Sequence, residues 1–404
     1  MKNRLNIGKI YFIYLFLILF LQIVGVSNKG GIIDTLWKAS VISATLFYVL
    51  VKTNMKIKRY VVIPLFIYVL GQVIAILSNP HSSTTSFINC MIIVAMTYMF
   101  LSMPYYNLKY KLTDMIWFVN AFIILMLYAV GFNLIKNPSA VLGAFSNTNV
   151  YSNMMSSFFD NKQTFGMFLF MAFIVSIWGF VLKNQKRYIG AAIIFFVNLF
   201  LCLSRTALFA CLGFIFIIII SIRKSNRRLF GILIFSIILV VLLIQFNPTL
   251  NQFIENVVLD TNATMEARTN IWEGAFKAIH NIKFIWGYGE GNATAAIATV
   301  SHSANAHNGI VYVLLTGGII KLSLYSMVVL KALFSIREIR KYNSTVASMF
   351  FAALISVIIY SMGEALVLLD SSAPCVVASI ICVAFPIATE GYYALCRTSV
   401  EHRS

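Results

Sequence analysis

Residues 307–334, HNGIVYVLLTGGIIKLSLYSMVVLKALF, indicate the fold class of this chain most directly. It is apolar almost throughout, and about 20 such residues in a helix suffice to cross the hydrocarbon core of a bilayer. A polar segment rich in Arg, Gly, Asn and His precedes it, from about residue 247 to 306. The junction predicts a membrane helix whose first residues, His307 and Asn308, lie at the membrane surface.

Similar apolar runs fill most of the 404 residues, of which 60% are hydrophobic and 11% charged, against roughly 25% charged in soluble domains. The first run follows basic residues but lacks a clear cleavage site, so we expect it to be retained. The expected fold is an all-α integral membrane protein of about twelve transmembrane helices with a large late extracytoplasmic loop. The predicted spans are 10–26, 32–51, 60–77, 86–103, 114–132, 164–182, 188–203, 207–222, 229–246, 307–334, 345–362 and 374–395.

The domain organisation that this pattern predicts is one polytopic membrane domain over residues 1–404. Most of the loops are short, but two outer loops are long. They are residues 133–163 and the larger loop 247–306, which carries the candidate site. No composition shift or low-complexity linker marks a separate soluble domain.

The basic excess, a formal net charge of +18, follows this topology. With a cytoplasmic N-terminus, 22 of the 31 basic residues fall in inner segments, as the positive-inside rule requires. Both termini are therefore expected in the cytoplasm of a cell whose inner (cytoplasmic) membrane holds the protein. Because loop position accounts for the charge, no nucleic-acid partner is predicted. The inner basic residues are Lys2, Arg4, Lys9, Lys52, Lys56, Lys58, Arg59, Lys109, Lys111, Lys183, Lys186, Arg187, Arg223, Lys224, Arg227, Arg228, Lys331, Arg337, Arg340, Lys341, Arg397 and Arg403.

The predicted spans contain few ionisable groups, and this weakens the hypothesis of an ion-coupled carrier, whose path needs buried acids or bases. Lys321 is the basic residue within a span, and we expect it to snorkel toward the inner interface. The six cysteines lie in or beside spans without metal-ligand spacing, so neither disulfides nor a metal site is predicted. Functional charges are therefore expected near the outer face.

Two arginines are candidates for binding an anion there. Arg205 lies in the short outer turn Ser204-Arg205-Thr206, and Arg268 lies in the large loop. The planar guanidinium suits the paired oxygens of a diphosphate and stays charged at physiological pH. For each, an ordinary interfacial or solvated arginine remains the alternative.

His307, where the loop enters a span, is the third candidate, because an imidazole can take a proton from an attacking hydroxyl. The alternative is a histidine bonded to loop backbone. The glycines of Gly287-Tyr288-Gly289-Glu290-Gly291 predict a tight turn, since no βαβ context supports a dinucleotide site. Glu290 is a weaker candidate for the site.

Residues 266–280 have the pattern of a short amphipathic helix. Arg268, Trp272, Ala275 and Ile279 share one face, while Glu273 and Lys277 point away. We expect this helix to lie along the bilayer interface, with Trp272 as its anchor.

Together these segments resemble those of a known superfamily. The series Arg268…Trp272…Trp286-Gly-Tyr-Gly289, Ala306-His307-Asn308 and Gly317-Gly318 resembles the signature loop of bacterial O-antigen polymerases and O-antigen ligases. Ser204-Arg205-Thr206-Ala207 resembles the arginine-bearing turn of the same superfamily, and residues 159–166 resemble its Asn-Lys-rich helix start. The resemblance covers roughly residues 140–335. The ligase-style continuation Gly-x-x-Gly-Thr after the histidine is absent, which favours a polymerase.

The resemblance implies a C-type glycosyltransferase fold and undecaprenyl-diphosphate-linked glycan substrates in the presence of membrane lipids. It implies a metal-independent, inverting transfer without cofactor, in which His307, Arg268 and Arg205 are catalytic and Asn308, Trp272, Glu290 and Tyr288 bind substrate. A chain-length regulator is a candidate partner. A repeat-unit polymerase for O-antigen or capsule is the first hypothesis. A ligase-type transferase and a lipid-linked glycan transporter are the alternatives.

Overall fold

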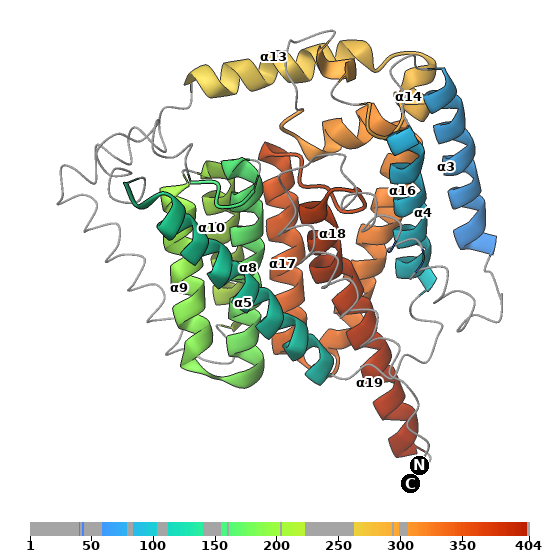
Figure 1. Cartoon of the computed structure of the whole chain (residues 1–404). Coiled ribbons are helices and arrows are strands. Elements are labelled where there is room, and N and C mark those ends of the chain that lie inside the picture. The colour runs from blue at the N-terminus through green and yellow to red at the C-terminus, as the bar shows by residue number, and fades with distance from the viewer. Residues whose placement is uncertain are drawn as a thin grey trace. The chain divides into compact units, whose positions relative to one another are not determined.

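The computed structural model describes residues 59–78, 84–102, 112–139, 155–159, 161–202, 204–222, 262–292, 295–298 and 306–401, together with residues 40 and 43. The secondary structure in these ranges is helical, with no strand (Figure 1). The helices are α3 (Arg59–Leu77), α4 (Thr84–Ser102), α5 (Leu112–Lys136), α8 (Lys162–Lys183), α9 (Lys186–Leu201), α10 (Arg205–Ile222), α13 (Asn262–Ala278), α14 (Ile282–Trp286), α16 (Gly309–Arg340), α17 (Ser344–Gly363), α18 (Ala373–Ser379), the π-helix η3 (Ile380–Ala384) and α19 (Phe385–Glu401).

Six stretches of the described helices are long and apolar enough to cross a membrane. They are Arg59–Leu77, Met115–Lys136, Lys162–Lys183, Gly309–Arg340, Ser344–Gly363 and Ala373–Ala394. Each coincides with a predicted span, so the class of multi-pass helical membrane protein is confirmed. Shorter apolar helices cover two further predicted spans, at Ser86–Leu101 and Arg205–Ser221. The predicted spans 10–26 and 229–246 lie outside the described residues, and so does 32–51 apart from residues 40 and 43.

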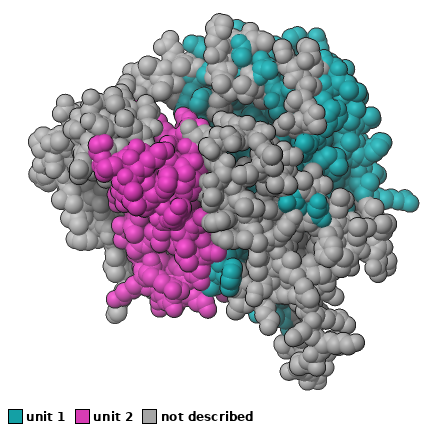
Figure 2. Space-filling model, in the orientation of Figure 1, with its two compact units in different colours: residues 1–118, 268–342, 361–404 teal, residues 119–267, 343–360 magenta. Residues whose placement is uncertain are grey.

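The chain divides into two compact units (Figure 2). Unit 1 comprises residues 1–118, 268–342 and 361–404, and unit 2 comprises residues 119–267 and 343–360. The large polar loop and the helix that follows it therefore belong to unit 1 from Arg268 onward. Arg205 belongs to unit 2.

Unit 2 is built around α8, which is buried along most of its length and packs against α9 and α10. Asn161 caps the start of α8, because its Oδ1 accepts a hydrogen bond from the backbone N–H of Thr164 at 2.8 Å. The end of α8 is closed by Asn184 in the left-handed conformation. A side chain at Gly166 would meet the Ser204 hydroxyl, so this glycine lets α8 approach the turn before Arg205 closely.

Unit 1 is organised by α16, which packs against α3, α4, α14 and α19. This helix is broken at Gly318, whose φ of 59° and ψ of −158° are available essentially to glycine alone. A Cβ at Gly318 would clash with the backbone carbonyl of Ile285, at the end of α14. The break in α16 is therefore the place where the backbone of α14 packs directly against it.

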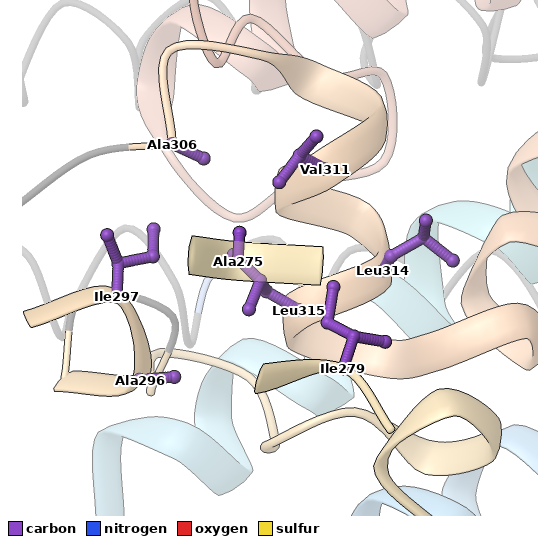
Figure 3. Close-up of a cluster of buried hydrophobic side chains, with 8 residues drawn as sticks. All are labelled: Ala275, Ile279, Ala296, Ile297, Ala306, Val311, Leu314 and Leu315. Carbon is purple, nitrogen blue, oxygen red and sulfur yellow. The ribbon is translucent and has the colours of Figure 1, made fainter. Parts of the chain in front are cut away.

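A cluster of buried apolar side chains joins α13 to the first half of α16 (Figure 3). Trp272 and Tyr312 pack against it. The shared face predicted for α13 is confirmed, because Ala275 and Ile279 are buried in this cluster. The Trp272 ring packs in part against this cluster, and its role as an anchor at the bilayer interface stays a prediction. The cluster consists of Ala275, Ile279, Ala296, Ile297, Ala306, Val311, Leu314 and Leu315.

Candidate active site

The start of α16 holds His307 in a constrained position. Asn308 caps the helix, with its Oδ1 accepting hydrogen bonds from the N–H groups of Ile310 and Val311 at 2.9 and 3.1 Å. His307 itself has a φ of 46°, in the left-handed region that few non-glycine residues occupy. Gly309 then lets the helix approach Ser361 closely. The imidazole is thus positioned by a tightly packed backbone turn.

A glutamate joins His307 to Arg268. Oε2 of Glu364 lies 3.1 Å from Nδ1 of His307, and Oε1 of the same carboxylate lies 3.5 Å from Nη2 of Arg268. The Glu364 side chain is 7% exposed, whereas those of His307 and Arg268 are 24% and 26% exposed. The Glu364 carboxylate is therefore buried, while the His307 and Arg268 side chains both remain partly accessible to a substrate.

This arrangement divides proton transfer and charge stabilisation between two side chains. An ionised Glu364 accepts a hydrogen bond from Nδ1–H of His307, and in that tautomer Nε2 carries the lone pair that a base uses. Arg268 directs one amino group of its fork at Glu364 and has further N–H donors for an anion. A base and an anion binder held by one carboxylate suit a reaction in which a hydroxyl attacks and an anion leaves.

Trp272 and Asn308 support this site structurally. The indole Nε1 of Trp272 donates a hydrogen bond to the carbonyl of Ala306 at 2.9 Å, immediately before His307. Asn308 donates from Nδ2 to the carbonyl of Met362 at 3.3 Å, two residues before Glu364. The two contacts connect the backbones on either side of the His307–Glu364 pair.

Tyr288 and Glu290 belong to a different set of contacts. The Tyr288 hydroxyl donates to the carbonyl of Ala278 at 3.0 Å. Glu290 is 1% exposed, and its Oε1 lies 2.6 Å from Nζ of Lys321 and accepts a hydrogen bond from Tyr68 at 2.7 Å. Burial raises the pKa of the Glu290 carboxyl, and the Lys321 ammonium acts in the opposite direction. The structure thus does not group Glu290 with Arg268 and His307.

Arg205, the remaining predicted catalytic residue, is the first residue of α10 in unit 2 and is partly exposed. The backbone carbonyl of the preceding Ser204 accepts a hydrogen bond from the N–H of Leu208 at 3.0 Å, which closes the first turn of α10. Arg205 is therefore at a helix start, as the short-turn prediction requires. Its catalytic role stays a prediction.

Two of these partners were not found from the sequence. Glu364 lies two residues beyond the predicted span 345–362, and no local motif marks it. Its acidic side chain in a short outer loop was the available signal. Lys321 does not snorkel, because it is 2% exposed and paired with Glu290. Within the described ranges, no three His, Cys, Asp or Glu side chains gather as potential metal ligands.

Residues 190–326 match the O-antigen ligase family. This match confirms the resemblance to the superfamily of O-antigen polymerases and ligases for that part of the chain, about a third of its length. The O-antigen ligase match includes Arg205, Arg268, His307 and both partners of the Glu290–Lys321 pair. Glu364 lies beyond it. No curated protein matches the chain.

Proposed function

We propose that this protein is a polysaccharide repeat-unit polymerase of the O-antigen or capsule type. It joins undecaprenyl-diphosphate-linked glycans at the outer face of the cytoplasmic membrane, with both termini in the cytoplasm. The observation that carries the proposal is the single carboxylate, Glu364, shared between His307 and Arg268. The O-antigen ligase family match supports the substrate class, a lipid-linked glycan.

In this proposal, a sugar hydroxyl of the acceptor attacks the anomeric carbon of the donor glycan. The new C–O bond forms as the bond from that carbon to the lipid diphosphate breaks, with inversion at the carbon. Nε2 of His307 takes the hydroxyl proton, and Glu364 stabilises the resulting imidazolium. The bonding electrons leave with the diphosphate, whose growing charge Arg268 stabilises, a contribution of about 3–4 kcal/mol per donor. Arg205 is proposed as a second cation for the same anion.

A ligase-type transferase is the second candidate, and the match to the O-antigen ligase family favours it. The same base and anion binder would serve, because both reactions break the bond to lipid diphosphate. The two functions differ in the acceptor, which is a growing lipid-linked chain for a polymerase and a separate molecule for a ligase.

The test is the pattern of lipid-linked and surface glycans from cells with the wild-type protein, without it, or with His307→Ala. For a polymerase, we expect loss of the long-chain ladder in the last two strains, while single repeat units still reach their acceptor. Accumulation of long lipid-linked polymer that never reaches its acceptor establishes the ligase. An unchanged pattern in the strain lacking the protein contradicts both.

A further inference from the structure

The break at Gly318 divides α16 into two halves, and His307 lies just before the first half. The first half runs from Gly309 to Gly317 and carries His307 and Asn308 at its start, and the second half continues to Arg340. Because Gly318 interrupts the helical backbone, no continuous helix fixes the angle between the halves. Other contacts must set that angle.

The loop after α14 holds the end of the first half. The N–H groups of Tyr288 and Gly289 donate to the carbonyls of Leu315 and Thr316 at 2.7 and 3.1 Å. These are carbonyls that the break leaves without helical partners. Gln72 of α3 adds a donor from its Nε2 to the Thr316 carbonyl at 3.2 Å. The first half is thus fastened to the loop and to α3.

Lys321 extends these contacts to the second half. Its Nζ donates to Oγ1 of Thr316 at 2.9 Å, back across the break, and lies 2.6 Å from Oε1 of Glu290 in the loop. The aliphatic stem of Lys321 covers Gly317, where any side chain would clash with it. One ammonium therefore connects the second half of α16, the first half and the loop.

Glu290 is held as firmly as its partner. Its carboxylate accepts the Tyr68 hydroxyl, and its backbone N–H donates to Oε1 of Gln72 at 2.9 Å. A buried charge pair repays the cost of desolvation only when its geometry is good and further hydrogen bonds complete it. Tyr68 and Thr316 complete the Glu290–Lys321 pair with those hydrogen bonds. The fold therefore provides partners for both buried charges.

We propose that Lys321 and Glu290 form a staple across the break in α16 that positions His307 for the reaction. The catalytic part of this inference rests on the proposed function. At 1.5 Å per residue, His307 lies about 15 Å along the helix from the break, so a tilt of about 4° displaces it by about 1 Å. Misplacement of a catalytic group by 1 Å can cost about 10²-fold in rate.

The first test measures the angle without any need for activity. Spin labels are placed on cysteines at Ile310 and Leu330, which are exposed on the first and second halves and about 30 Å apart along the helix. Exposed Cys396 is replaced by serine, and the other five cysteines are buried. We expect a narrow distance distribution in the wild type and a broad or shifted one in Lys321→Met/Glu290→Gln.

The double variant leaves neither charge buried alone, so it is expected to fold. Lys331→Met is the matched control, because Lys331 lies in the same helix, pairs with Glu390 at 2.9 Å and does not cross the break. Its distribution should stay at the wild-type width. Thr316→Val removes the hydroxyl that Lys321 reaches and should broaden the distribution while the ion pair persists. A double-variant distribution that superimposes on the wild type overturns the staple.

The second test measures glycan transfer by the double variant. A positioning role predicts that kcat falls by about 10²-fold while KM and the melting temperature stay near those of the wild type. Unchanged kcat with a broadened distance distribution overturns the positioning role. If the wild-type protein transfers no glycan at all, the proposed function fails, and the spin-label result still decides whether the staple exists.

Discussion

Glu364 gives each of its oxygens to a different partner, and this division makes it the residue whose charge the proposed site depends on most. Glu364→Gln keeps the size of the side chain but removes the charge that stabilises an imidazolium at His307. We expect the rate of glycan transfer to fall by about 10²-fold or more, because general-base catalysis contributes about 10²–10⁴-fold. The measurement is single-turnover transfer by purified protein in nanodiscs.

The matched control for this change is Glu338→Gln. Glu338 is a more exposed carboxylate near the end of α16 and pairs with Lys341 at 2.7 Å. Loss of the Glu338 charge should leave the rate of glycan transfer unchanged. Equal rates for Glu364→Gln and Glu338→Gln would remove Glu364 from the mechanism.

Arg268 differs from a simple positive charge, because it bonds Glu364 with one nitrogen and has other donors in a fixed plane. Arg268→Lys is expected to lower transfer by about 10²–10³-fold, since an ammonium cannot hold Glu364 and bridge diphosphate oxygens in the same geometry. Transfer is measured beside Arg337→Lys, an exposed arginine on α16. Substantial activity of Arg268→Lys would reduce the role of Arg268 to charge alone.

At the scale of residues, the sequence indicated Arg268 and His307 because each is a polar group in an outer loop and belongs to a recognisable pattern. It did not indicate their partner. Glu364 is separated from His307 by 57 residues and from Arg268 by 96. Such a pairing depends on how distant segments pack, and a local pattern does not contain that information. For the same reason Lys321 was expected to snorkel rather than meet Glu290.

At the scale of helices, six of the twelve spans predicted from hydropathy coincide with long apolar helices of the described residues, because the requirement for some 20 apolar residues dominates their composition. It did not predict the break in α16, since a glycine pair hardly changes an average over a span. For α13 the apolar face was predicted correctly, and its protein partner was not predicted. One apolar face packs equally well on lipid or on protein, so its pattern does not indicate that Ala275 and Ile279 pack in the cluster around Leu315.

The break gives a prediction about stability. Gly318→Ala should destabilise the protein by about 1–3 kcal/mol from backbone conformation alone, and the clash with Ile285 adds to this. Gly190→Ala, on α9 with open space around it, should be neutral or stabilising by about 0.5–1 kcal/mol. Thermal unfolding in nanodiscs compares the two. A melting temperature of Gly318→Ala at or above that of Gly190→Ala would contradict the strained break.

For the whole molecule, α16 provides a test of orientation. Its 32 residues are long enough to place its two ends on opposite sides of a membrane. Glu273→Cys on α13 and Lys341→Cys after α16 are both exposed positions, introduced into a Cys396→Ser background. In intact cells, an impermeant thiol reagent should label Glu273→Cys and spare Lys341→Cys. The reverse pattern would place the candidate site on the cytoplasmic side of the membrane. It would then contradict the proposal that the donor glycan reacts at the outer face.

The Glu290–Lys321 pair also bears on how the chain enters the membrane. A lysine near the centre of a span raises the free energy of insertion by about 2.5–3.5 kcal/mol, whereas each Leu, Ile, Phe or Val lowers it by about 0.3–0.6 kcal/mol. The apolar residues around Lys321 can therefore offset its cost during synthesis. Glu290 precedes Lys321 in the chain and is already translated when the lysine emerges, so the pairing found in the finished fold need not await any later helix.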